Sequence, residues 1–284
     1  MPEADSVWRT ARRLHLACSN TIVRNAELRW PSLAGVDLAG WTTLEVVARG
    51  KHLLHRFDSG FTLHSHLRME GRWEVSVGSG HRPPSSSDVR AWMSSEQWSA
   101  RGRRLGMLNV VRTDRENRLV GHLGPDILNQ DWAVGAMSSL LIRDSRAIGE
   151  VLLDQSVIAG LGTMWISEAL FNRRLNPWVP GEHLDREVVQ DLLGLLRRWL
   201  WLATEGSLLR GPGHGRQGAP GRVHGRSGRP CELCGGCVRV AMIGPVKQQR
   251  TMFYCPECQG GYAPTDDRRP QRPLGSGYKG SRRR

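Results

Sequence analysis

The chain has 284 residues, of which 39% are hydrophobic, so it is long enough for two domains and a small appendage. Its 40 basic residues outnumber the 27 acidic ones and give a formal net charge of +13, which predicts a polyanionic partner. The sequence contains neither a run of about 18 apolar residues nor a signal-peptide core. We therefore expect a soluble intracellular protein that binds nucleic acid and not a membrane.

A helix is predicted over residues 6–18, very close to the amino terminus. Apolar residues recur at helical spacing from Val7 to Cys18, and Asp5 or Ser6 is a suitable N-cap. Chain termini are usually frayed, but here the opening residues "MPEAD" are tied to a packed element.

From about Trp41 the hydrophobic period changes to two, which predicts strands. The strands are expected at residues 44–48, 53–57, 61–65, 73–77, 89–93, 105–112 and 118–122. Such a series of short strands is typical of an antiparallel β-sandwich or a barrel-like sheet. The stretch "LGPD" at 123–126 closes this domain, which we place at residues 1–125.

The next part of the chain, residues 126–228, has helical patterns. Helices are expected at residues 131–142, 145–154, 163–173 and 185–204. Before the third helix, "QSVIAGLGT" contains tight turns at Gly160 and Gly162. The N–H groups of such a turn can bind a phosphate, and an ordinary turn between packed helices is the alternative. Residues 205–230 are expected to form a flexible basic connector that touches a phosphate backbone.

Five of the six cysteines crowd together near the carboxyl end, which favours a metal site over disulfide bonds. Two CxxC motifs are separated by 20 residues, the spacing of two zinc-ribbon knuckles. The cysteines of these motifs are Cys231, Cys234, Cys255 and Cys258.

Cys237 makes the choice of ligands ambiguous, because it forms a further CxxC pattern with Cys234. The two glycines before Cys237 fit a knuckle turn, so we assign Cys237 no metal. We expect one structural Zn²⁺ ion on four thiolates, in a zinc finger of residues 229–262. Residues 263–284 are expected to form a disordered basic tail.

Lysine is rare in this chain, since only three of the 40 basic residues are lysines. Lys51 is the sole lysine before Lys247. Arginine stays protonated at any relevant pH, whereas a lysine can pass a proton or place a compact ammonium against one phosphate. Lys51 is therefore a candidate functional residue. The alternative is that a single lysine remains among the arginines by chance.

Taken together, these stretches resemble the formamidopyrimidine-DNA glycosylase and endonuclease VIII family of base-excision repair enzymes. The resemblance rests on "MPE", "RGKHLL", "HSHLRMEGRW", "HLGPD", "LLDQSVIAGLGTMWISEAL", "VHGRSGRPC" and "QRTMFYCPECQ", which follow the family's order from residue 2 to about 260. The stretch "PEADSVWRTARRLH" looks more like the actinobacterial endonuclease VIII branch. The resemblance implies an α+β chain with a helix-flanked β-sandwich, a helix-two-turn-helix domain and a four-cysteine zinc finger.

The resemblance also implies a reaction and its residues. After removal of Met1, the secondary amine of Pro2 would attack C1′ of a damaged nucleoside and release the base through a Schiff base. Glu3 would act as acid and base, and Lys51 and Arg250 would bind phosphates near the lesion. Further DNA-binding residues are implied at Arg68, Met69, Glu70, Gly162 and Thr163. The implied partner is damaged DNA, in duplex, bubble or single-stranded form, bound by a monomer in the bacterial cytoplasm.

The chain departs from the family pattern at three positions. Ala4 stands where glycine is usual, Ser6 replaces a glutamate of the formamidopyrimidine branch, and Thr163 replaces an asparagine that bonds a phosphate. We expect such changes to affect the reaction rate and the range of lesions more than the class of reaction. A zinc-finger protein that binds damaged DNA without chemistry is the alternative, and an RNA-binding module is a third.

Overall fold

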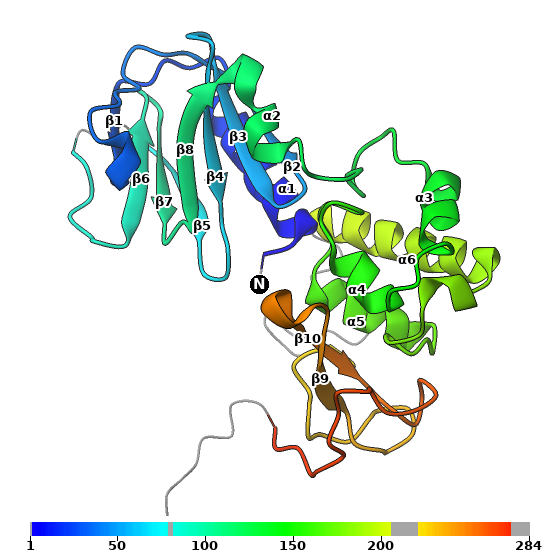
Figure 1. Cartoon of the computed structure of the whole chain (residues 1–284). Helices are drawn as coiled ribbons and strands as arrows, with labels where there is room; N and C mark the ends of the chain where they lie inside the picture. Colours follow the sequence, from blue (N-terminus) through cyan, green and yellow to red (C-terminus); the bar gives the residue numbers. More distant parts are fainter. Residues whose placement is uncertain (1, 79–81, 206–220, 274–284) are drawn as a thin grey trace, which may run out of the picture. The chain divides into compact units, whose positions relative to one another are not determined.

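The computed structural model describes residues 2–78, 82–205 and 221–273, which form two compact units (Figure 1). The first unit comprises residues 1–130 with 155–160, and the second comprises residues 131–154 with 161–284. The predicted α+β architecture of sandwich, helical domain and cysteine cluster is confirmed.

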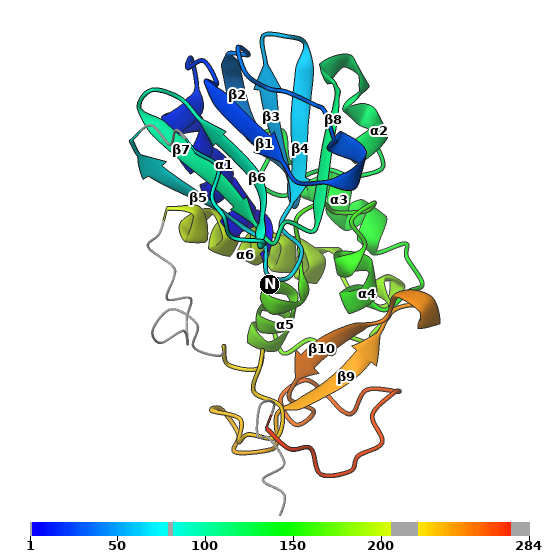
Figure 2. The same cartoon turned by 90° about the vertical axis from the view of Figure 1, so that its left-hand side faces the viewer.

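The first unit is a sandwich of two four-stranded antiparallel sheets, seen from two directions in Figures 1 and 2. One sheet has the order β1 (Asn25–Leu28), β6 (Val89–Ser94), β7 (Trp98–Arg103) and β5 (Arg72–Val77). The other has the order β2 (Thr43–Arg49), β3 (His52–Phe57), β4 (Phe61–His66) and β8 (Met107–Arg112). Helix α1 (Ala4–Cys18) contacts strands of both sheets.

The core of this unit lies between the sheets and under α1. The helix buries Val7, Leu14 and Cys18 there, on the side that the hydrophobic spacing predicted. From the sheets come alternate residues such as Leu53 and Leu63, as the period of two requires. These side chains hold α1, and with it the amino terminus, against the sandwich.

Two parts of this unit differ from the sequence-based prediction. The strand expected at residues 118–122 is a helical turn, α2 (Asn117–Val120), after a 3-10 turn at Thr113–Arg115. The N–H groups of Leu119 and Val120 both bond to the Glu116 carbonyl, which closes the turn. Strands β1 and β7 were not predicted, because "NAEL" and "WSARGR" lack the β-branched alternation that marks strands.

Within the described part of the second unit, the helices agree with the prediction in number and order. They are α3 (Val134–Leu141), α4 (Ile148–Leu153), α5 (Thr163–Asn172) and α6 (Arg186–Thr204), with a 3-10 turn at Gly181–His183. A small antiparallel hairpin follows, made of β9 (Arg239–Ile243) and β10 (Arg250–Tyr254) with the turn η4 (Val246–Gln248) between them.

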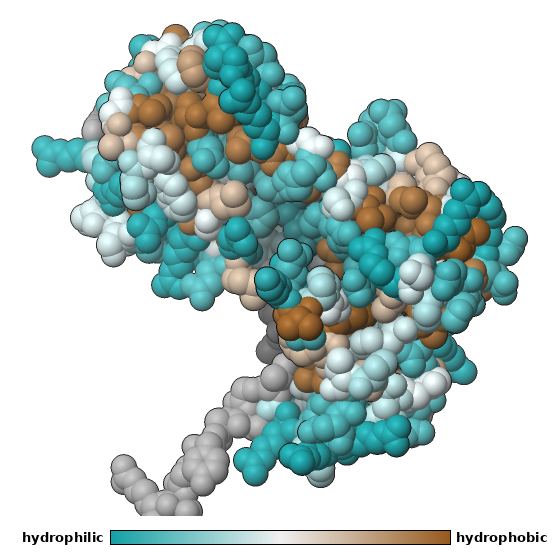
Figure 3. All heavy atoms as spheres, viewed as in Figure 1, coloured by the Kyte–Doolittle hydropathy of each residue, from teal (hydrophilic) through white to brown (hydrophobic). Residues whose placement is uncertain are grey.

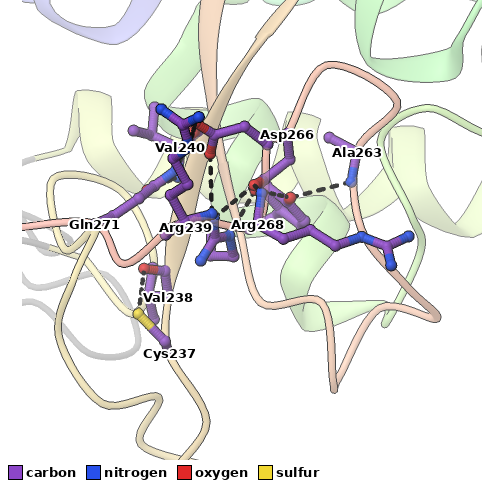
Figure 4. A network of polar contacts seen from close by, with 11 residues as sticks. Cys237, Val238, Arg239, Val240, Ala263, Asp266, Arg268 and Gln271 are labelled. Carbon is purple, nitrogen blue, oxygen red and sulfur yellow. Dashed lines mark hydrogen bonds and ion pairs between the residues drawn. The ribbon is translucent and has the colours of Figure 1, made fainter.

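Residues 263–273, which the sequence analysis placed in a disordered tail, are fastened to this hairpin (Figure 4). The buried Arg239 guanidinium pairs with Asp266 at 2.5 Å, and the Tyr254 hydroxyl donates to the same carboxylate at 2.6 Å. Burial alone would raise the pKa of Asp266, but these hydrogen bonds lower it to about 2. Residues 206–220 of the predicted connector and 274–284 of the predicted tail lie outside the described residues.

Hydrophilic side chains cover much of the face drawn in Figure 3, interrupted by apolar areas. Among the described residues, no helix combines the length and the apolar composition that crossing a membrane requires.

Candidate active site and metal centre

The amino terminus is held in place by the first turn of α1, which begins two residues earlier than predicted. Glu3 is the N-cap residue, and its backbone N–H donates to Ser6 Oγ at 3.0 Å while the Ser6 hydroxyl donates to the Glu3 carbonyl at 2.9 Å. Glu3 is 1% exposed, and Pro2 before it is half-buried. This cap gives Ser6 a structural role at the position where the formamidopyrimidine branch has glutamate. It orders the residues on which the expected chemistry depends.

The loop that contains Gly160 anchors the same turn of α1. The Ala4 N–H donates to the Gly160 carbonyl at 3.1 Å, within the first unit. Gly160 has φ of +104°, and a Cβ added there would lie 2.8 Å from the Ala4 Cβ. The methyl group of Ala4 therefore fits beside the terminus because residue 160 has no side chain.

Replacing Gly160 by alanine is expected to lower the free energy of unfolding by about 2 kcal/mol, because the new methyl group meets Ala4 in a backbone conformation that alanine avoids. Denaturant unfolding measures the change. Gly194→Ala is the matched control, since a Cβ there meets nothing within 4 Å and helix α6 favours alanine. Equal stability of the two variants would contradict the predicted contact.

Lys51 lies in the turn between β2 and β3, which the "LGPD" segment secures. The Gly50 N–H donates to Asp126 Oδ2 at 2.5 Å, and the Arg49 guanidinium donates to the Gly124 carbonyl at 2.9 Å. Gly50 has φ of +58°, and a Cβ there would lie 3.1 Å from the Ala159 Cβ. Asp126 thus positions the Lys51 turn. The hydrogen bond from Gly50 to Asp126 was not predicted from the sequence, although an acid after Gly-Pro in "LGPD" was a signal for it.

Arg68, Met69 and Glu70 form an exposed loop after β4. Met69 is 65% exposed, which argues against a core position for its side chain. Glu70 pairs with Arg104 at 2.9 Å, and Arg68 has φ of +53°. The Arg68 N–H donates to His66 Nδ1 at 2.9 Å. Burial, together with the charges of Arg68, His64 and Lys51, lowers the pKa of His66 to about 4, so His66 is neutral at pH 7.

Gly162 and Thr163 lie in the second unit, at the N-terminus of α5. Gly162 is the N-cap residue in an extended conformation, and its carbonyl accepts from the Ile166 N–H at 3.1 Å. Thr163 opens the helix and is 5% exposed. The N–H groups of a helix's first turn are not paired within the helix, which suits an anion at this end.

Four thiols gather in the second unit as the spacing predicted. The Sγ atoms of Cys231, Cys234, Cys255 and Cys258 all lie within 4.8 Å of one another. The Cys231–Cys258 and Cys234–Cys255 pairs are 3.8 and 3.5 Å apart. A tetrahedral ion with metal–sulfur bonds of about 2.3 Å needs sulfurs about 3.8 Å apart, so these thiols fit a metal ion.

Cys237 lies outside this cluster and is exposed. Its Sγ contacts the Val238 carbonyl at 3.4 Å. The glycines before it form the knuckle turn: Gly235 has φ of +75°, and the Gly236 N–H donates to Cys234 Sγ at 3.4 Å. The assignment of Cys231 and Cys234 to the metal site is therefore supported by the turn's hydrogen bonds.

Arg250 is the first residue of β10 and is exposed, and Lys247 lies in the turn η4 before it. Strand β10 runs from Arg250 to Tyr254, next to the ligand Cys255. The strand that carries Arg250 thus leads directly into the thiol cluster.

Glu168, which the sequence analysis missed, fixes the start of the segment that leads to the metal site. Its carboxylate is 3% exposed and accepts three backbone N–H groups, from Arg222 (3.0 Å), Val223 (3.0 Å) and His224 (2.8 Å). A Cβ at Gly221 would lie 2.2 Å from its Oε1. A lone acid inside the apolar stretch "ISEALF" of α5 was the available signal.

The candidate residues therefore divide between the units. Pro2, Glu3, Lys51 and the 68–70 loop belong to the first unit, whereas Gly162, Thr163, Arg250 and the four cysteines belong to the second.

Two family models match the chain: the formamidopyrimidine-DNA glycosylase N-terminal domain over residues 1–108, and its H2TH domain over residues 123–209. The probable endonuclease 8 2 of Streptomyces coelicolor is 41% identical over 266 residues, which are 93% of this chain and 96% of that protein. The DNA-(apurinic or apyrimidinic site) lyase Nei2 of Mycolicibacterium smegmatis is 34% identical over 263 residues, 91% of this chain and 99% of that protein.

Among solved structures, the Lactococcus lactis formamidopyrimidine-DNA glycosylase, non-covalently bound to DNA with an abasic site, shares the fold. It has a TM-score of 0.74 and 23% identity, over 91% of this chain and 100% of that one. The matches to the two family models thus cover the sandwich and the helical domain, and the solved structure shares the overall fold. The chain belongs to the formamidopyrimidine-DNA glycosylase and endonuclease VIII family of DNA glycosylases and abasic-site lyases.

Proposed function

We propose that this protein is a bifunctional DNA glycosylase and abasic-site lyase whose nucleophile is the amine of Pro2. The observation that carries the proposal is the anchored first turn of α1, where Ser6 and Gly160 hold Glu3 and Ala4 directly behind Pro2. A nucleophile at a frayed terminus would have to be ordered in each turnover, and an anchored turn directly behind Pro2 reduces that cost.

Removal of Met1 makes Pro2 a secondary α-amine. An α-amine with a pKa of about 8 is about one-tenth neutral at pH 7, which is enough for attack on C1′ of a damaged nucleoside. A new C1′–N bond forms while the bond to the base breaks; the departing base takes up a proton and the amine nitrogen loses one. Glu3 protonates the deoxyribose ring oxygen, the sugar ring opens, and an iminium ion joins Pro2 to C1′.

Strand cleavage follows from the acidity of the iminium ion. Loss of the C2′ proton expels the 3′ phosphate by β-elimination, and a second elimination removes the 5′ phosphate. Hydrolysis of the remaining iminium bond returns the Pro2 amine. The substitution, the two eliminations and the hydrolysis involve no net oxidation or reduction, so the reaction needs no redox partner.

The DNA contacts that we propose for the other residues are those that the resemblance to the family implies. Lys51 and Arg250 each place a cation on a phosphate near the lesion, and the N-terminus of α5 at Gly162 and Thr163 binds another. The target base must leave the stack before Pro2 can reach C1′. The exposed Met69, flanked by Arg68 and Glu70, would fill the gap as an apolar wedge.

We propose that the ion held by the four cysteines is Zn²⁺, because four thiolates in a closed tetrahedral site are typical of structural zinc. When bound, such an ion supplies structure and no open coordination position. The substrates that we propose are abasic sites and oxidised pyrimidines in DNA. The name of the abasic-site lyase of Mycolicibacterium smegmatis supports the first, and the resemblance to endonuclease VIII implies the second. We further propose that the protein acts as a monomer in the bacterial cytoplasm.

Borohydride trapping on abasic-site DNA tests the proposal. The processed protein is expected to form a covalent adduct with the DNA, because borohydride reduces the iminium bond to a stable amine. A form that retains Met1 is the control and should form none, since its proline nitrogen is a tertiary amide. Binding without any adduct by the processed protein would instead indicate a damage-binding protein without chemistry.

A further inference from the structure

Four histidines and an asparagine gather at one end of the β2-β3-β4-β8 sheet. In the strand register, His52 of β3 lies opposite His66 of β4, and His64 of β4 lies opposite Asn109 of β8. The ring of His122, from the segment before "LGPD", lies 6.3 Å from that of His52. The same end of the sheet carries the Lys51 turn, which His52 closes, and the 68–70 loop, which follows His66.

Hydrogen bonds link three of these side chains in a row. His52 Nδ1 is 2.8 Å from His64 Nε2, and His64 Nδ1 is 3.1 Å from Asn109 Nδ2. The His52 and His64 rings stack with centroids 5.1 Å apart, and His64 is fully buried.

The direction of these bonds follows from the chemistry of the groups. An amide nitrogen can only donate, so His64 Nδ1 accepts from Asn109. A neutral His64 then has its proton on Nε2 and donates to His52 Nδ1. His52 in turn must keep its proton on Nε2. The Nε2–H group of His52 is therefore the hydrogen-bond donor at the outer end of this row.

The surroundings keep the row neutral and favour an anion. Burial and the neighbouring basic groups lower the pKa of His52 to about 3, and burial lowers that of His64 to about 4. Lys51 and Arg68 add positive charge at His66, and Arg68 also at His52. Glu116, an acid whose charge acts on His64, is already bonded by Arg56 and Thr62 at 2.6 and 2.5 Å. Fixed cations beside a neutral N–H donor are an arrangement that binds phosphate.

We propose that His52 is a DNA-binding residue whose Nε2–H donates to a backbone phosphate beside the one held by Lys51, and that His64 and Asn109 are positioning residues that fix this donor. The proposal rests on the DNA-binding part of the proposed function and adds a neutral contact to it. It assigns a function to three polar residues that the proposed chemistry does not use.

Binding to duplex DNA that contains a tetrahydrofuran abasic analogue tests the proposal, because this analogue cannot form an iminium ion with Pro2. His52→Leu is expected to weaken binding about tenfold, the loss typical of one hydrogen bond to a charged group. His52→Gln retains an N–H donor and should restore most of the affinity. His183→Leu, at an exposed histidine of the second unit, is the matched control and should bind as the wild type does.

The salt dependence of binding separates this contact from a charged one. A neutral donor releases no counterion, so His52→Leu should leave the slope of log K against log salt unchanged. Lys51→Gln should reduce that slope by about 0.9. A reduced slope for His52→Leu, or binding within twofold of wild type, would overturn the proposal. The trapping reaction is scored separately, so a failure here is distinct from a failure of the Pro2 chemistry.

The protonation of the rings provides a test without any variant. Nitrogen-15 NMR of the wild-type protein at pH 7 is expected to show His52 and His64 protonated at Nε2 and not at Nδ1. Asn109→Asp, which offers His64 an acceptor in place of a donor, should move both protons to Nδ1 and weaken DNA binding as much as His52→Leu. Wild-type rings protonated at Nδ1 would contradict the proposed row.

Discussion

Glu3→Gln is expected to reduce excision of an oxidised base about 10³-fold, within the range typical of a lost general acid. The amide has nearly the same shape as the carboxyl group, so the buried site at the start of α1 keeps its packing. Trapping on a preformed abasic site should fall much less. An abasic sugar is already in equilibrium with its open aldehyde, so Pro2 needs no help to open the ring. Single-turnover cleavage of lesion-bearing DNA, beside borohydride trapping, measures both effects.

Ser6→Ala is the matched control for this prediction, because it removes the cap at Glu3 but leaves the carboxyl group. It should lower the free energy of unfolding by about 1 kcal/mol and reduce both activities by similar, modest factors. If Glu3→Gln also reduced both activities equally, Glu3 would be a structural residue and not the acid of the base-release step.

Cys255→Ser is expected to remove the bound metal and unfold the region around β9 and β10. Cys255 is fully buried, and a structural zinc site contributes on the order of 10 kcal/mol to the folding of its own region. Affinity for abasic-site DNA should then fall by about 100-fold, because Arg250 and its neighbours lose the strand that holds them. Metal content by mass spectrometry and DNA binding by fluorescence anisotropy measure the two losses.

Cys237→Ser is the control, since this thiol lies outside the cluster. It should retain the full metal content and the affinity of the wild type. Loss of the metal on replacing Cys237 would mean that the ligand set is different and that the knuckle turn ends at another cysteine.

Much of this arrangement could be predicted because it depends on local patterns. The helical period from Val7 to Cys18 and the spacing of the two CxxC motifs are each encoded within a few neighbouring residues. The four helices of the second unit were found in the same way. Strand β7 was missed because its small residues become buried only when β5 and β6 pair on either side.

The ties that position the candidate site could not be predicted, because their partners are far apart in the chain. Asp126 bonds to Gly50 across 76 residues, and Glu168 reaches residues 222–224 across 54 to 56. The row from Asn109 to His52 depends on the register of three strands, which no single stretch of sequence specifies. Such pairings become visible only when the sheet is assembled.

The hydrogen bonds between the Glu168 carboxylate and the N–H groups of residues 222–224 have a consequence for how this chain can change during evolution. The stretch that leads to the metal site is fastened to α5 at its own entrance by three hydrogen bonds to one carboxylate. Residue 168 should therefore tolerate little change, because a side chain without a carboxylate would leave these backbone N–H groups without their acceptor.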